Sequence, residues 1–309
     1  MSRKILLASG CSFTAPDKRS FIVPDLDVDF PRWPQQLADK LDMECVNVAQ
    51  SGLGNFQIGQ RIFEYFLNNK QNIGLICVLW SEWTRTTIHP MFQPMNPIIS
   101  GLIDNPDDPS AIHMVWSRTY NKFLEESIRL HHPQETKSVI SNGCAKKLVE
   151  RNFFENIRFI YDIVSLAENK NIPHIHFQGL RPFTGDSTFN PESNMNPKLG
   201  QFEFLEKIYA PPQKDLAYLF EKYKNSFINF IGYPCSQEFG GYNVSDKLWV
   251  LEEMLDSVKG IVGEKNVPTN SYFVHPDDNH PNELGHEVIA DEFHKKVEEL
   301  YPKLISKKG

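Results

Sequence analysis

The chain has 309 residues, of which 40% are hydrophobic and 23% charged, so it can bury a substantial core in one large α/β domain or two small ones. The formal net charge is −7, and Lys and Arg cluster nowhere along the chain. Nucleic acid is therefore disfavoured as a partner, because phosphate binding needs clustered cations. None of the five cysteines forms a Cys-x-x-Cys pair, so a zinc or redox motif is unsupported.

Targeting signals are equally scarce in the sequence. The first apolar run is only about five residues long, and no small-residue cleavage site follows it. The longest apolar runs are too short to span a bilayer. The cysteine content suits a reducing compartment. We therefore expect a cytoplasmic protein that has no membrane partner, and the sequence leaves its oligomeric state open.

Apolar runs and helical patterns alternate over the first 80 residues. Ile5–Ala8, Cys45–Ala49 and Ile73–Trp80 are short apolar runs typical of strands buried on both faces. Helical spacing lies between them, over Trp33–Leu41 and 58–66. Each strand leads into a polar or Gly-bearing loop. This alternation predicts a parallel sheet built from βαβ units.

The rest of the chain continues the pattern less regularly. We predict strands over 172–177 and 227–231, and helices over 116–130, 152–169, 215–223 and 282–300, with one more helix within 240–270. Two stretches rich in Pro, Asn and Asp, near 86–148 and 180–214, are expected to be insertions at the active-site edge of the sheet. The segment 15–34 is expected to be a loop lying over Ser12. We interpret 1–309 as a single domain whose sheet has about five strands.

A serine follows the first strand, and an acid and a histidine stand together near the end of the chain. Ser12 lies within Ser9–Thr14, and the late segment runs Asp277–Asp278–Asn279–His280–Pro281. A serine hydroxyl becomes a nucleophile when a histidine takes its proton, and a carboxylate fixes the tautomer of that histidine. Backbone N–H groups at Gly-rich turns can stabilise the oxyanion that forms on attack. The sequence therefore predicts a hydrolytic site that unites Ser12 with His280.

These segments resemble the conserved blocks of the SGNH/GDSL hydrolase superfamily. Gly10–Cys11–Ser12 is similar to the first block, with Cys11 where the family has aspartate. Asn47–Gly52 is similar to the second block, and Asp277–Pro281 to the last, which Gly285–His286 follows. The resemblance implies a three-layer α/β/α sandwich and a serine esterase without a cofactor. It implies the triad Ser12, Asp277 and His280, with the N–H groups of Ser12 and Gly52 in the oxyanion hole.

The third block departs from the family pattern. Strand three ends in Trp80–Ser81–Glu82–Trp83–Thr84–Arg85, which lacks the usual asparagine. Asn55, Ser81 or Arg85 is the candidate third oxyanion donor, and Asn55 completes the expected oxyanion hole. This variant resembles SGNH-type proteins of tailed bacteriophages. That likeness implies a virion-associated enzyme acting on acylated surface sugars, with an O-acetylated carbohydrate favoured over a long-chain lipid.

Several of these residues also have a simpler interpretation. Asp278, two residues from His280, competes with Asp277 for the role of triad acid. Ser12 could complete a turn or cap a helix, and Gly52 could serve only a positive-φ turn. Cys11 is an alternative nucleophile, although a small packed residue behind Ser12 is the favoured interpretation.

Other candidates are expected to be structural. His286 is expected to pack on the last helix, His275 to lie in a loop, and Cys45 and Cys77 to be buried thiols. His131–His132 is too isolated to indicate a metal site. The aromatic residues that could stack on a sugar, but more often anchor a core or a loop, are Trp80, Trp83, Phe92 and Trp116.

Two further functional hypotheses belong to other classes. The missing third-block asparagine suits a catalytically degenerate SGNH domain that serves as a carbohydrate-binding or structural virion module. A flavodoxin-like nucleotide binder would use the turn at Gly10–Thr14 for phosphate. It is disfavoured because no Gly-x-Gly-x-x-Gly or P-loop pattern is present.

Overall fold

The computed structural model describes most of the two ends of the chain and parts of its middle. The described residues are 3–18, 26–69, 72–81, 86–88, 113–115, 144–179, 228–231, 243–244, 247–248, 250–252, 254, 271–275 and 278–305.

Five parallel strands form the central sheet, in the order β2-β1-β3-β6-β7. They are β1 (Ile5–Gly10), β2 (Glu44–Asn47), β3 (Ile73–Trp80), β6 (His174–Gln178) and β7 (Phe230–Ile231). β1 and β3 are mostly apolar and buried on both faces, as is typical of strands in the middle of a parallel sheet. The strand order reverses between β1 and β3, and a ligand is expected at that point, beyond the carboxyl ends of the strands.

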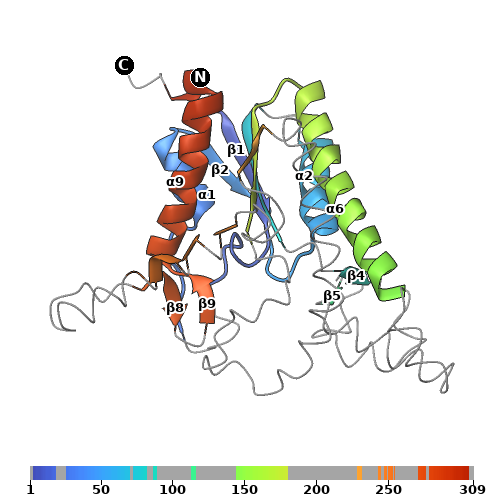
Figure 1. The fold of residues 1–309 in the computed structure, drawn as a ribbon. Coiled ribbons are helices and arrows are strands. Elements are labelled where there is room, and N and C mark those ends of the chain that lie inside the picture. The colour runs from blue at the N-terminus through green and yellow to red at the C-terminus, as the bar shows by residue number, and fades with distance from the viewer. Residues whose placement is uncertain are drawn as a thin grey trace.

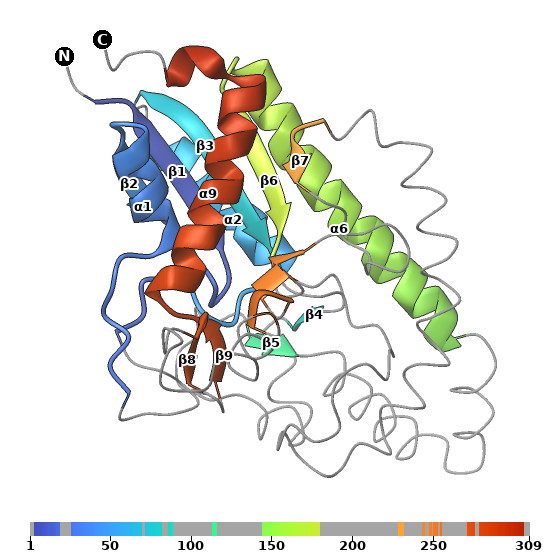
Figure 2. The same ribbon diagram turned by 60° about the vertical axis from the view of Figure 1, so that its left-hand side comes forward.

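Helices cover both faces of the sheet, so the fold is the expected three-layer α/β/α sandwich. Figure 1 shows α1 (Trp33–Lys40) and α9 (Glu283–Leu300) on one face, with α2 (Asn55–Asn68) and α6 (Cys144–Asn169) on the other. The two views together show that the strands point toward the β8–β9 hairpin, Phe273–His275 with Asp278–Pro281, below α9 (Figures 1 and 2).

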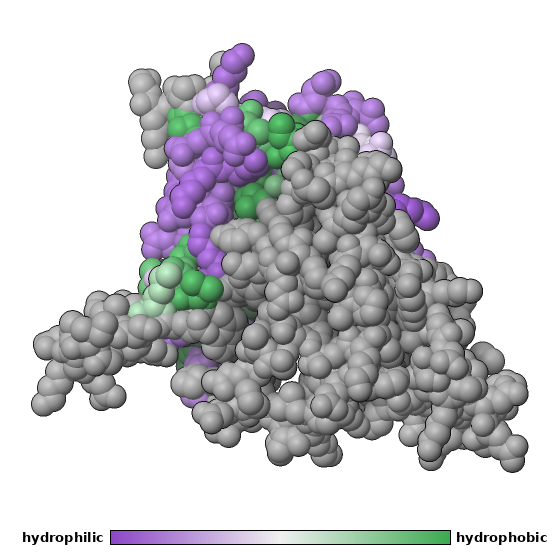
Figure 3. Space-filling view, viewed as in Figure 1, coloured by the Kyte–Doolittle hydropathy of each residue, from purple (hydrophilic) through white to green (hydrophobic). Residues whose placement is uncertain are grey.

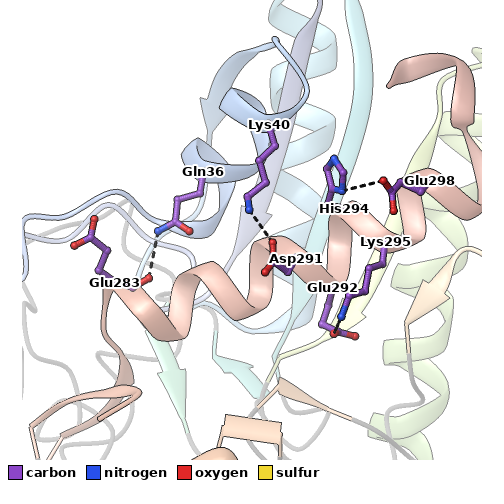
Figure 4. Close-up of polar contacts among 8 residues, drawn as sticks. All are labelled: Gln36, Lys40, Glu283, Asp291, Glu292, His294, Lys295 and Glu298. Atoms are coloured by element: carbon purple, nitrogen blue, oxygen red, sulfur yellow. Dashed lines mark hydrogen bonds and ion pairs between the residues drawn. The ribbon is translucent and has the colours of Figure 1, made fainter. Parts of the chain in front are cut away.

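Aromatic packing holds the α1–α9 layer against the sheet. The Trp33 ring stacks on Phe293 of α9 with centroids 4.4 Å apart, and Phe293 meets Phe177 of β6 edge-on at 5.7 Å. Polar pairs line the outside of this contact: Lys40 Nζ lies 2.7 Å from Asp291 Oδ1, and the Gln36 amide donates to the Glu283 carbonyl (Figure 4). Figure 3 shows hydrophilic side chains over this part of the surface. Such exposed pairs add little stability, so the aromatic contacts determine where α9 sits.

The opposite layer is anchored by a hydrogen bond as well as by apolar contacts. Ser9 Oγ donates to the Ile58 carbonyl of α2 at 3.0 Å, which fixes α2 against β1. Gly59 of α2 faces Ile163 of α6, whose side chain would lie at an ordinary contact distance of 3.8 Å from an added Cβ. The Phe56 and Phe159 rings also meet, at 5.4 Å. α6 therefore packs on α2 through apolar side chains.

The structure adds some elements to those expected from the sequence. α6 begins at Cys144 rather than near residue 152, inside the first expected insertion. β4 (Thr86–Ile88) and β5 (His113–Val115) form an antiparallel pair in that insertion. The β8–β9 hairpin was not expected, because a three-residue strand and a polar Asp-Asn-His strand carry no apolar alternation. His275 accordingly lies in a strand and not in a loop.

The remainder of both insertions, with the helices expected over 116–130 and 215–223, lies outside the described residues. The described positions within 244–254 are helical, as expected. Among the helices that the structure describes, none is long and apolar enough to cross a bilayer.

Candidate active site

Ser12 stands in a tight turn at the carboxyl end of β1. The Cys11 carbonyl accepts hydrogen bonds from the N–H groups of Thr14 and Ala15, both at 2.9 Å, and this closes the turn. Cys11 is completely buried, whereas Ser12 is partly exposed. A Cβ at Gly10 would lie 2.2 Å from Thr14 Oγ1 and 3.0 Å from the Leu79 carbonyl oxygen, so only glycine fits there. The turn thus presents Ser12 rather than Cys11, which favours the packing role for Cys11.

A carboxylate and a histidine pair within the β8–β9 hairpin. His280 Nδ1 lies 2.5 Å from Asp278 Oδ1, and the same oxygen accepts the His280 backbone N–H at 3.1 Å. The Asp278 side chain is only 1% exposed, and that of His280 is 26% exposed. A hydrogen bond from Nδ1–H to a carboxylate leaves Nε2 as the basic nitrogen. Asp277 lies outside the described residues, so its assignment stays a prediction, and the observed contact favours the alternative acid, Asp278.

One ring contact brings the two ends of the chain together. The Phe13 ring meets the His280 ring edge-on, with centroids 5.5 Å apart and an interplanar angle of 62°. Phe13 directly follows Ser12 in the turn after β1. The histidine of the late block therefore lies beside the serine turn, 268 positions away from Ser12 along the chain.

The loop that contains Gly52 rests on the same turn. The Asn47 amide donates to the Thr14 carbonyl at 2.7 Å, while its oxygen accepts the Ala49 N–H at 3.0 Å. The Gln50 N–H in turn points to the Gly10 carbonyl at 3.4 Å. Gly52 has a φ of 84°, a conformation that favours glycine. Gly52 is therefore needed for the turn, whether or not its N–H also serves an oxyanion.

Asn55 is tied to the end of β3. Its Oδ1 accepts the Ser81 N–H at 2.8 Å, and its Nδ2 donates to the Ser81 carbonyl at 3.1 Å. The Gln178 amide donates to the same carbonyl at 2.9 Å. An oxyanion role for Asn55 would therefore fall to its second amide N–H. Of the other two expected candidates, Ser81 is the residue that Asn55 contacts, and Arg85 lies outside the described residues.

His286 is a buried structural residue, as expected. Its Nδ1 faces the Trp33 N–H at 3.3 Å, and its Nε2 faces a guanidinium nitrogen of Arg32 at 3.2 Å. Burial lowers the pKa of His286 well below its usual value, and the nearby Arg32 and His280 lower it further. His286 is therefore neutral near pH 7. Arg32 was not singled out from the sequence, since a lone arginine before a helix carries no signal of its own.

The remaining candidates divide between the core and the part of the chain that is not described. Trp80 is completely buried and donates Nε1–H to His176 Nδ1 at 3.1 Å, so it anchors the core rather than a sugar. Cys77 is buried and Cys45 partly so, and burial raises the pKa of Cys45 to about 12. No cluster of metal-ligating side chains occurs among the described residues. Trp83, Phe92, Trp116 and His131–His132 lie outside them.

No protein-family model and no curated protein matches this chain. Several solved structures resemble it, among them the following three. A G-D-S-L family protein from Desulfitobacterium hafniense has a TM-score of 0.39 at 12% identity, covering 95% of this chain and 99% of its own. An alpha/beta hydrolase enzyme from the metagenome of Lake Arreo, Spain, has a TM-score of 0.31 at 14% identity, covering 96% and 95%. A GDSL-like protein from Parabacteroides merdae has a TM-score of 0.34 at 13% identity, covering 96% of each chain. With TM-scores this low, the case for function rests on the site's own contacts.

Proposed function

We propose that the protein is a serine ester hydrolase of the SGNH type. The observation that carries the proposal is the buried Asp278 carboxylate on His280 Nδ1, in a hairpin whose histidine ring lies against Phe13, next to Ser12. A serine, a histidine and an orienting carboxylate are the three groups that acyl transfer needs. In the proposed site they come from opposite ends of the chain, and the ring contact between Phe13 and His280 supports their proximity.

The proposed reaction assigns one task to each residue. His280 Nε2 takes the proton from Ser12 Oγ as the oxygen attacks the ester carbonyl, and returns it to the leaving alcohol. Asp278 holds the histidine tautomer and stabilises the imidazolium that forms. The N–H groups of Ser12 and Gly52, with Asn55 as the candidate third donor, hold the oxyanion. Water then hydrolyses the acyl-enzyme by the same proton transfers in reverse.

An O-acetylated carbohydrate is the substrate class that we propose. The described surroundings of the site are polar, with Asn47, Gln50 and Ser51 on the loop beside the serine turn. A short acyl group on a sugar fits such surroundings better than a long apolar chain does. A virion-associated location, and the absence of nucleic acid and membrane partners, remain predictions from the sequence.

The test compares the hydrolysis of p-nitrophenyl acetate by the wild type and by Ser12→Ala. A serine-directed fluorophosphonate, followed by mass spectrometry, identifies the labelled residue. We expect turnover in the wild type, label on Ser12, and loss of both in Ser12→Ala, because the nucleophile is then missing. Release of acetate from acetylated oligosaccharides then tests the substrate class. A variant that keeps wild-type turnover without Ser12 would refute the proposal.

A binding module is the second candidate. The observation that favours it is the Asn55 amide, which is engaged with Ser81 while the third block has no asparagine of its own. An incomplete oxyanion hole could leave a fold that binds acylated glycans without cleaving them. Absence of turnover and label, together with specific retention of a glycan on an array, would support this candidate over the esterase.

A further inference from the structure

Four side chains outside the proposed triad link the three segments that carry it. One guanidinium nitrogen of Arg32 lies 3.2 Å from His286 Nε2, and the other donates to the Asp17 carbonyl at 2.7 Å. The Asp17 carboxylate accepts a hydrogen bond from Ser51 Oγ. We refer to His286, Arg32, Asp17 and Ser51 as the polar belt. It runs from α9 to the segment after Ser12, and on to the loop that holds Gly52.

Each end of the polar belt is rigidly connected to a group of the site. Asn282, between His280 and His286, accepts the Gly285 N–H at 2.9 Å and donates to the carbonyls of Ser271 and Phe273. The hairpin and the first turn of α9 therefore move together. At the other end, Ser51 directly precedes Gly52. One side chain, Arg32, thus contacts both α9, through His286, and the segment after the serine turn, through the Asp17 carbonyl.

Burying the guanidinium of Arg32 costs more free energy than burying an apolar side chain at the same position would. It is only 8% exposed, and its guanidinium lies over the Phe30 ring at 4.4 Å. Within the described part of the chain, its Nε has no hydrogen-bond partner. A buried donor without a partner costs free energy, and well-packed apolar residues often replace a buried charge at no loss of stability. The buried guanidinium is therefore only weak evidence of a stabilising role.

A planar, forked cation does have a geometric advantage at this position. It can bind a ring nitrogen and a carbonyl from two different segments at fixed angles, which a flexible ammonium group cannot do. Because arginine stays charged in proteins, the contact does not depend on pH near neutrality. The arrangement therefore suits the task of holding catalytic segments in register.

We propose that Arg32 is a positioning residue for the hydrolytic site, and that Asp17 relays its effect to the Gly52 loop. The inference rests on the proposed esterase function. Arg32 touches neither the substrate nor the reacting atoms, and it acts by fixing where His280 and Gly52 stand relative to Ser12. A misplacement of about 1 Å can lower the rate of such a site by roughly 10²-fold. Loss of Arg32 should therefore lower kcat and leave KM nearly unchanged.

The experiment compares Arg32→Met with the wild type, using p-nitrophenyl acetate turnover and the rate of fluorophosphonate labelling of Ser12. We expect kcat and the labelling rate to fall together by about 10²-fold, with KM within a factor of about three. The matched control is Arg158→Met, because Arg158 is an exposed arginine on α6 that pairs only with Asp162 in the described structure. Circular dichroism at the assay temperature confirms that each variant is folded.

Two further variants separate positioning from general damage to the fold. Arg32→Ala leaves a space for a free guanidinium ion, and millimolar guanidinium should restore part of the turnover without affecting the control. Ser51→Ala combined with Arg32→Met should cost little more than Arg32→Met alone, since both break the same connection. A folded Arg32→Met with unchanged kcat, or additive losses in the double variant, would overturn the inference. Absence of Ser12 labelling in the wild type would instead overturn the esterase proposal, and this inference with it.

Discussion

At the scale of single residues, the choice of acid depends on one spacing. The family pattern places an aspartate three residues before the histidine, at Asp277, whereas the hydrogen bond to His280 comes from Asp278, two residues before it. In an extended strand, residues two apart lie on the same face. β9 begins at Asp278, so its carboxylate and the His280 ring share a face of the hairpin. The sequence left both acids open because the strand itself could not be predicted.

Asp278→Asn should lower kcat by roughly 10³- to 10⁴-fold, because an amide can neither hold the Nδ1–H tautomer nor stabilise the imidazolium. The matched variant Asp277→Asn should lower kcat by less than about tenfold. Steady-state hydrolysis of p-nitrophenyl acetate by both variants decides between the two acids. The reverse order of effects would assign the role to Asp277.

At the scale of elements, the site depends on how the β8–β9 hairpin is attached to α9. Asn282 is the N-cap of that helix, and its amide also holds the carbonyls of Ser271 and Phe273. The helix predicted over 282–300 is confirmed, and it begins at Glu283, directly after Asn282. The hairpin before the helix was not predicted, since its pairing depends on these amide contacts rather than on an apolar pattern.

Asn282→Ala should lower the free energy of unfolding by about 1–2 kcal/mol, the usual cost of losing an N-cap. It should also loosen the hairpin and so reduce the rate of Ser12 labelling. Urea titration and labelling kinetics measure the two effects. Gln60→Ala is the control, because Gln60 makes an exposed side-chain contact on α2. A variant with wild-type stability would show that the cap does not hold this helix start.

At the scale of the whole molecule, buried histidines couple stability to pH. Trp80 donates to His176 Nδ1, so His176 carries its hydrogen on Nε2 and donates it to His174 Nδ1, 3.1 Å away. Burial lowers the pKa of His174, and burial followed by the neighbouring His174 lowers that of His176 much further. His286 behaves in the same way. All three side chains are nearly inaccessible to water. Protonating any of them in the folded state therefore costs free energy, because the imidazolium would be buried.

The protein should therefore lose stability as the pH falls below 6.5, the usual histidine pKa. Below that value the unfolded chain binds protons that the folded chain does not, at up to about 1.4 kcal/mol per pH unit for each buried histidine. Urea midpoints at about pH 7.5, 6.5 and 5.5 measure the effect. Glu292, whose carboxylate has a lowered pKa, would contribute only below its usual value of 4.5. An equal or higher midpoint at the lowest pH would contradict this expectation.

The sequence by itself predicted the five strands of the central sheet in their chain order, and it singled out Ser12 and His280 as candidate residues from the two ends of the chain. A short apolar run such as Ile73–Trp80, bounded by loop residues, predicts a buried strand, and the structure confirms it as β3. These features are local, because each depends on neighbours within a few residues.

Only the tertiary structure decided which acid meets His280, that Trp80 belongs to the core, and that Arg32 connects α9 to Asp17. These contacts join residues from distant parts of the chain or from a hairpin without an apolar pattern. The contact between an Arg32 guanidinium nitrogen and His286 Nε2 spans 254 positions, and it exists only once α1 has packed on α9. Pairing across such separations follows from packing, which no local pattern encodes.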